Sequence, residues 1–176
     1  MKDGRNYISA TACEILTRKK RVIVDKWFEK ILETYPADTA RFLREKEDPF
    51  GNPVGTTIYR GLEGLYEELC TGMDIAKVKA CLDGIIRIRA VQDFTPSQAV
   101  AFIFHIKDVL KGELAGEIQE KGLSLEDLED RLEELALLTF DIYMQCREQL
   151  WEIKVKEIKN RTSRLLQRAN LNVNIP

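Results

Sequence analysis

The final third of the chain constrains the fold more than any other segment. After Gly122, the stretch from Ser124 to about Asn170 contains neither proline nor glycine. Ser124 followed by Asp127 has the pattern of a helix-capping box, so the stretch is predicted to be one helix. A helix of roughly 45 residues would be on the order of 68 Å long. A globule of 176 residues has a radius of gyration of only about 16 Å, so part of this helix must protrude or pair with another chain.

Apolar residues in this segment recur at alternating intervals of three and four, which is typical of coiled-coil helices. The first register comprises Leu125, Leu128, Leu132, Leu135, Thr139, Ile142 and Cys146. The second register comprises Trp151, Val155, Ile158, Thr162, Leu165 and Ala169. A phase slip near Gln149 separates them, so the first register is predicted to face the globule and the second to be a homodimer interface. Trp151 is expected to contribute most to that interface, because buried aromatic side chains dominate interface energies.

The protruding segment leaves two alternatives open. Residues 151–169 carry a surplus of basic side chains, but apolar residues interleave them throughout, which favours a coiled coil over a nucleic-acid-binding helix. Two packings of such a helix can differ by only a few kcal/mol, so the segment is either a bistable signalling element or a static strut.

Upstream of this helix, apolar residues recur with the helical period, and no convincing alternating run bounded by turns occurs. The chain is therefore predicted to be all-α. Turns and capping residues delimit helices over residues 9–35, 38–46, 54–70, 75–92 and 96–121. The first helix includes Val22 in its apolar stripe, and Phe42 is expected to point inward from the second. In the loop over residues 47–55, Phe50 and Val54 are expected to pack onto the core.

Local signals refine these helices. Asp74 and Thr95 are predicted N-caps, with Pro96 at a first helical position. Gly61 and Gly64 indicate that their helix approaches another one closely. A bend is expected near Gly112 or Gly116 in the 96–121 helix.

The composition excludes several classes of chemistry. A single histidine rules out most histidine-based metal sites and catalytic triads, and the four cysteines contain no CxxC pair. The cysteines are predicted to be packed, reduced thiols. The paired carboxylates lie on charged, solvent-exposed helix faces, so they are not expected to act as a catalytic acid and base. No enzyme activity, metal or cofactor is therefore expected. Without an apolar signal segment or a membrane-length apolar run, a cytoplasmic protein is predicted.

A candidate ligand pocket surrounds the lone histidine. Phe102 lies on the apolar face of its predicted helix, His105 lies on the flank of that face, and Phe104 points nearly opposite. His105 is either a boundary residue with one solvated nitrogen or an axial haem ligand. Phe104 either packs in a helix buried on two sides or contacts a partner or ligand. We predict no haem.

Several motifs resemble the N-terminal sensor domain of the RsbR-type stressosome proteins, the co-antagonists of RsbT. They are Trp27 with Tyr35-Pro36, Asp48-Pro49-Phe50 with Asn52-Pro53-Val54-Gly55, and the run from Arg87 to Ser97. The resemblance extends from roughly Ile15 to Leu166. It implies a globin-like all-helical fold without haem, dimerisation, and a last helix that leads toward a C-terminal STAS domain phosphorylated by kinases. No STAS domain follows in this sequence, so signalling through such a domain is not expected of this chain by itself.

Together, these observations predict a globin-like helical sensor domain over residues 1–150, followed by the protruding helix end and a short tail over residues 151–176. The predicted function is non-catalytic regulation by a homodimer in stress or metabolic signalling. The predicted partners are a second copy of the chain and, as a further candidate, a separate signalling protein, but neither nucleic acid nor membrane. The alternative function is a sensor that binds haem or a small apolar ligand.

Overall fold

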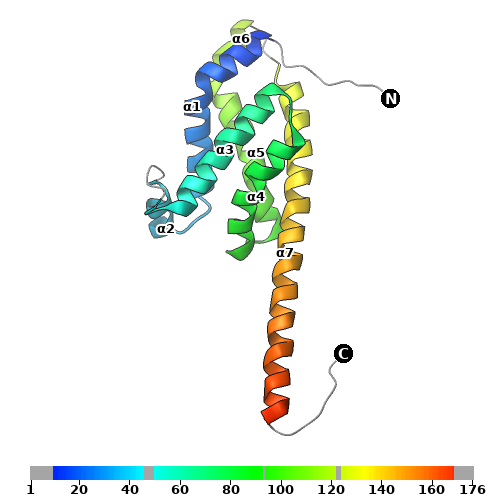
Figure 1. Ribbon diagram of the computed structural model, residues 1–176. Helices are drawn as coiled ribbons and strands as arrows, with labels where there is room; N and C mark the ends of the chain where they lie inside the picture. Colours follow the sequence, from blue (N-terminus) through cyan, green and yellow to red (C-terminus); the bar gives the residue numbers. More distant parts are fainter. Residues whose placement is uncertain (1–9, 46–49, 93, 122–123, 169–176) are drawn as a thin grey trace, which may run out of the picture.

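The computed structural model describes residues 10–45, 50–92, 94–121 and 124–168, and these residues form an all-α structure without strands. Within these described ranges, seven helices follow one another (Figure 1). They are α1 (Ala10–Leu32), α2 (Ala37–Leu43), α3 (Pro53–Thr71), α4 (Ile75–Val91), α5 (Pro96–Glu113), α6 (Ala115–Lys121) and α7 (Glu126–Arg168). The prediction of an all-α fold with a long C-terminal helix is confirmed.

One hydrophobic core joins the long helices. Helix α1 packs on α3 and α5, α3 packs on α4, and both α4 and α5 pack on α7. Only the first part of α7 lies against this bundle, and the rest of the helix runs beyond it (Figure 1). Leu150 still packs against the core, whereas the next residue, Trp151, is 62% exposed. The 43 residues of α7 span about 65 Å, so the helix is longer than the globule that it supports.

The capping predictions for α4 and α5 are confirmed. The carboxylate of Asp74 accepts hydrogen bonds from the backbone amides of Ala76 and Lys77 at the start of α4. Thr95 forms a capping box with Gln98, and Pro96 occupies the first turn of α5. These side chains satisfy amides that have no partner within the helix, which fixes where each helix begins.

The predicted 96–121 helix is interrupted at Leu114, between the two glycines at which a bend was expected. The Leu114 side chain is fully buried, and its carbonyl still accepts the amide of Ile118 at 2.9 Å. The hydrogen-bonded path therefore continues from α5 into α6 although the helix axis changes direction.

Two glycines permit the close packing of α3 on α4, as predicted. A Cβ atom at Gly61 would lie 2.8 Å from Cδ1 of Ile85, and one at Gly64 would lie 2.5 Å from Sγ of Cys81. Such distances are shorter than carbon and sulfur atoms tolerate, so a side chain at either position would force the Ile85 or Cys81 side chain to move.

The corner between α2 and α3 is held by polar contacts rather than by an aromatic anchor. The expectation that Phe50 packs onto the core is wrong, since its side chain is 98% exposed, and Phe42 and Val22 are also exposed. Val54 does pack against the core. Asn52, which is 2% exposed, hydrogen-bonds to the end of α2 and makes an apolar anchor unnecessary.

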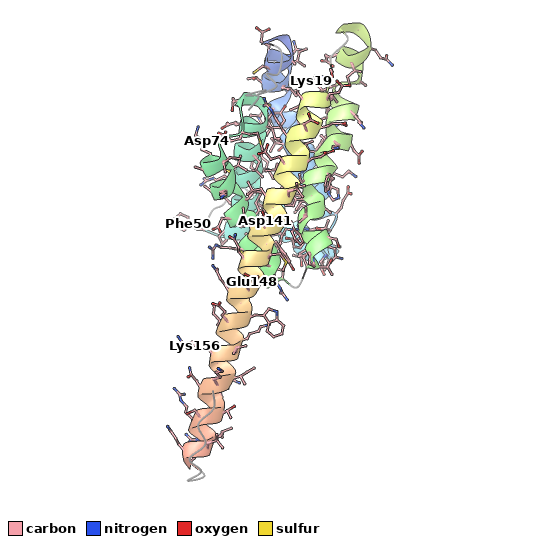
Figure 2. All side chains as sticks on the ribbon, turned by 90° about the vertical axis from the view of Figure 1, so that its right-hand side faces the viewer. Lys19, Phe50, Asp74, Asp141, Glu148 and Lys156 are labelled. Carbon is pink, nitrogen blue, oxygen red and sulfur yellow. The ribbon has the colours of Figure 1, made fainter. Side chains whose placement is uncertain are left out.

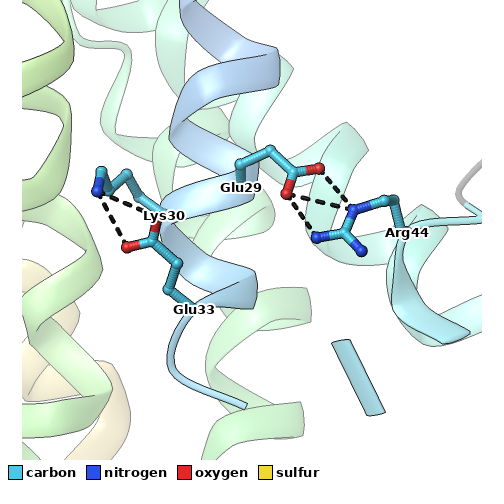
Figure 3. Close-up of polar contacts among 4 residues, drawn as sticks. All are labelled: Glu29, Lys30, Glu33 and Arg44. Carbon is cyan, nitrogen blue, oxygen red and sulfur yellow. Dashed lines mark hydrogen bonds and ion pairs between the residues drawn. The ribbon is translucent and has the colours of Figure 1, made fainter. Parts of the chain in front are cut away.

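A surface ion pair adds to this corner from α1 (Figure 3). Arg44, which follows α2, donates three hydrogen bonds to the carboxylate of Glu29, one from Nη2 at 2.8 Å and two from Nε at 3.0 and 3.3 Å. Next to Glu29 on α1, Lys30 pairs with Glu33 at 3.0 Å. Both pairs are exposed, so each contributes only modestly to stability.

Candidate functional site

Helix α7 has two apolar faces, and the first packs against the globule. The residues of the first heptad register lie on this face, and all of them except the partly buried Leu125 are buried: Leu128, Leu132, Leu135, Thr139, Ile142 and Cys146. The prediction that this register faces the globule is confirmed.

The second face of α7 is exposed and apolar along most of the helix. We call it the outer stripe, and it comprises Leu137, Phe140, Met144, Trp151, Val155, Ile158 and Leu165. At about 100° per residue these side chains fall within an arc of about 80° on an ideal helix. Thr162 lies on the same arc and is partly exposed, whereas Ala169, the last residue of the predicted interface, lies outside the described residues. An exposed apolar stripe of this length is typical of a protein interface.

Sequence analysis missed the part of the outer stripe that runs along the globule. Leu137, Phe140 and Met144 carry the same spacing of three and four, but they interleave with the residues of the inner register. The two predicted registers therefore belong to two opposite faces of α7, one buried and one exposed. Both faces are present between Leu137 and Cys146, before the predicted phase slip near Gln149.

The protruding end of α7 is strongly basic. Between Trp151 and Arg168 the chain carries six basic and two acidic residues. Lys156 extends from this segment, well beyond the globule, whereas Asp141 lies on the part of α7 that runs beside it (Figure 2). Lys154 also lies 6.0 Å from the centre of the Trp151 ring, where its ammonium group is attracted to the ring face. The protruding end thus combines apolar and cationic contacts.

The three residues of the predicted ligand pocket face in different directions. Phe102 is fully buried and stacks on Trp27, with ring centroids 6.2 Å apart. Phe104 is exposed, and His105 is half-buried with its Nδ1 atom enclosed and without a hydrogen-bond partner. Two surface grooves, between α1 and α3 and between α4 and α7, are lined by other residues.

Next to Phe102 lies a buried cation that sequence analysis did not identify. Arg89 of α4 is 0% exposed, and its guanidinium carbon lies 4.1 Å from the ring centroid of Phe94. The rings of Phe102 and Tyr35 lie within 6 Å of the same carbon. A signal was available in the sequence: Arg89 follows the core residues Ile85 and Ile86 at helical spacing, so it falls on the apolar face of α4.

The shifted pKa of His105 makes the stability of the fold depend on pH. Burial lowers the pKa of its imidazole below the usual 6.5, and the positive charges of Arg89 and Lys30 lower that pKa further. The unfolded chain therefore binds a proton at a pH where the folded chain does not, and stability falls as the pH decreases from about 6.5 through the folded-state pKa.

We expect His105→Leu to fold normally, with a free energy of unfolding that is equal to wild type or up to about 1 kcal/mol higher at neutral pH, because the enclosed Nδ1 has no partner. The advantage of the variant should grow between pH 7.5 and 5.5, since it has no imidazole to protonate. Urea unfolding of both proteins at several pH values measures this difference. If the free energies of unfolding of the two proteins changed with pH in parallel, His105 would have the same pKa in the folded and unfolded chains, contrary to this prediction.

The cysteines show no sign of nucleophilic chemistry. All four are free thiols. Burial raises the pKa of the Cys70 thiol to about 12, and it also raises the pKa values of Cys81 and Cys146. Deprotonation of these three thiols is therefore unfavourable near neutral pH. Within the described part of the chain, no group of three or more histidine, cysteine or acidic side chains is placed to hold a metal ion.

No helix among the described residues is long and apolar enough to span a membrane. Even α7, whose length would suffice, carries charged residues along its whole length.

Comparisons with known proteins agree with the resemblance carried by the sequence motifs. The chain is 27% identical over 150 residues to an uncharacterised protein of Archaeoglobus fulgidus, an alignment that covers 81% of this chain and 85% of that protein. No solved structure matches the chain. The family model of the RsbT co-antagonist protein rsbRD N-terminal domain matches residues 21–157, which include most of the core and the start of the protruding helix. The chain therefore belongs to the family of RsbT co-antagonist rsbRD N-terminal domains.

Proposed function

We propose that this chain is a non-catalytic, globin-like regulatory domain that acts in the cytoplasm as a homodimer, in stress or metabolic signalling. Membership of the rsbRD N-terminal domain family supports a regulatory role in stress signalling. The observation that carries the homodimer is the outer stripe, in which seven large apolar side chains lie exposed along one face of α7. A second copy of the same stripe is a complementary partner, because a two-fold interface uses the same patch on both chains.

The energetics favour pairing of this stripe. Burying an apolar side chain such as Ile158 or Leu165 contributes roughly 1.5–3 kcal/mol relative to leaving it in water. The spacing of three and four lets side chains from two helices interdigitate over the protruding segment. The stripe also continues along the globule as far as Leu137, so the proposed contact is not confined to the protruding end.

The protruding end is also our candidate surface for a separate signalling protein. When the outer stripe is paired, the basic side chains on the flanks of α7 stay in solvent. Six cations in this segment would attract an acidic surface or an acidic helix.

Two isoleucines of α7 provide a matched test of the homodimer. Ile153 and Ile158 are each 63% exposed, but they lie five residues apart and therefore about 140° apart around the helix. Ile158 belongs to the outer stripe, and Ile153 does not. We expect Ile158→Glu to raise the dimer dissociation constant on the order of 100-fold, since each dimer would bury two unpaired carboxylates. Ile153→Glu should leave that constant nearly unchanged.

Sedimentation velocity at micromolar concentration measures both variants and wild type. Wild type and Ile153→Glu should sediment as dimers, and Ile158→Glu should sediment largely as a monomer with an unchanged helical circular dichroism spectrum. A monomeric wild type would contradict the proposal. Equal dissociation constants for the two variants would place the interface elsewhere on the molecule.

A further inference from the structure

Arg89, in the last turn of α4, carries a buried positive charge with which no carboxylate of the described residues forms an ion pair. Arg89 is fully enclosed, and a guanidinium group remains protonated at any physiological pH. Its Nη2 atom donates a hydrogen bond to the backbone carbonyl of Gln98 at 3.0 Å. Nε and Nη1 are buried and have no hydrogen-bond partner. Burial of an unpaired charge is costly, so this arrangement requires a compensating group.

Aromatic rings compensate only part of this cost. The ring of Phe94 covers a face of the guanidinium, and cation–π attraction acts on that face. The N–H groups, however, point outward in the plane of the guanidinium, and a ring below that plane does not accept them. The Tyr35 hydroxyl donates its proton to Gln92 at 2.9 Å, and its oxygen faces Arg89 as an acceptor. Nε and Nη1 of Arg89 still have no hydrogen-bond partner.

No carboxylate in the described part of the chain hydrogen-bonds to Arg89 either. Among the described residues, the buried side-chain nitrogen and oxygen atoms without a hydrogen-bond partner are Nε and Nη1 of Arg89 and Nδ1 of His105. His105 lies close enough for the charge of Arg89 to act on it. The acidic groups that act on His105 are Glu33, which pairs with Lys30, and Asp108. Two nitrogen-bearing side chains thus lie near each other inside the bundle without an acidic partner in hydrogen-bond contact.

We propose that Arg89 binds a small monovalent anion, such as chloride or formate, through Nε or Nη1. The charge of the anion neutralises the buried guanidinium, and its lone pairs accept the in-plane N–H groups. The anion is limited to a few heavy atoms, because the rings of Tyr35, Phe94 and Phe102 enclose the site.

Access to this site runs past Tyr35 and Gln92. Gln92 is exposed at the end of α4, and Tyr35 and Phe94 are only partly buried. The hydrogen bond between Tyr35 and Gln92 lies at this solvent-facing edge, so we expect an entering anion to require rotation of the Gln92 side chain. Because Arg89 lies inside a single chain, the proposal is independent of the homodimer.

The first experiment compares thermal unfolding in different anions at constant ionic strength, with gluconate as the large reference anion. Chloride and formate should each raise the Tm of wild type, with saturation. At ten times the dissociation constant the rise should be about 3–6 °C. Arg89→Met should abolish this saturable rise, whereas Arg41→Met, which removes an exposed cation from α2, should retain it. An equal response of wild type and Arg89→Met, or no response of wild type, would overturn the proposal.

The second experiment uses wild type alone, so it decides the question even if Arg89→Met does not fold. Crystals grown in bromide should show an anomalous peak within hydrogen-bond distance of Nε or Nη1 of Arg89. An ordered water molecule at that place, without anomalous signal, would show that solvent completes the site and would overturn anion binding. Chloride and formate are distinguished by their separate titrations in the first experiment.

Discussion

Replacing Asn52 with aspartate should lower the free energy of unfolding by about 3–5 kcal/mol, although the two side chains have nearly the same shape. The Asn52 amide nitrogen donates to the backbone carbonyls of Phe42 at 2.9 Å, Leu43 at 3.0 Å and Glu45 at 3.2 Å. Its oxygen accepts the amide of Gly55 at 2.8 Å. In the variant, a buried carboxylate oxygen would face three carbonyl oxygens, so attraction becomes repulsion.

A pH series separates this repulsion from simple loss of hydrogen bonds. Burial and the facing carbonyl groups should raise the pKa of the introduced carboxyl group above its unfolded value of about 3.9. The folded variant then binds a proton more readily than the unfolded one, so the destabilisation is greatest above the folded-state pKa and shrinks as the pH falls. Urea unfolding of wild type and Asn52→Asp at pH 7 and pH 5 measures the change.

Asn52→Ala is the matched control, because it removes the hydrogen bonds without adding charge. It should cost about 2 kcal/mol, and this cost should not depend on pH. Equal costs for the two substitutions at neutral pH would show that the α2–α3 corner rearranges to solvate the carboxylate.

Replacing Trp27 with alanine should lower the free energy of unfolding by about 3–5 kcal/mol. Trp27 is fully buried where α1 packs on α5. Its indole nitrogen donates to the carbonyl of Phe102 at 2.6 Å, and its ring stacks on the side chain of the same residue. The substitution would leave a cavity where α1 packs on α5. These two helices are far apart in the sequence, so no local contact replaces the lost one.

Trp27→Phe separates the hydrogen bond from the packing. It keeps most of the ring but removes the N–H donor, so a cost of about 1–2 kcal/mol is expected. Urea unfolding followed by far-UV circular dichroism measures both variants. Neither should change the dimer dissociation constant, because Trp27 lies far inside the bundle and the outer stripe lies on α7. A cost for Trp27→Ala below that of Trp27→Phe would contradict the packing argument.

Local sequence signals predicted the helices and most of their ends, although they gave residues 96–121 as one helix instead of two. Asp74 and Thr95 cap the residues that immediately follow them, and the spacing of Leu128, Leu132 and Leu135 defines one face of α7 without reference to any other helix. Gly61 and Gly64 indicated that α3 approaches another helix closely, because glycine has no side chain to hold the two helices apart. All of these signals act over about four residues, which is the range that a helix couples directly. The family motifs are local runs of the same kind.

Which apolar faces are covered depends on contacts between elements that lie far apart in the sequence. Leu137, Phe140 and Met144 have the composition and spacing of core residues, yet they are exposed because α4 and α5 already cover the opposite face of α7. Arg89 lies on the apolar face of α4, but its charged end is enclosed because Tyr35, from a distant part of the sequence, joins the nearby Phe94 and Phe102 around it. Burial depends on how many neighbours reach a side chain from elsewhere in the chain. The spacing of residues along one helix specifies a face but not what lies against it.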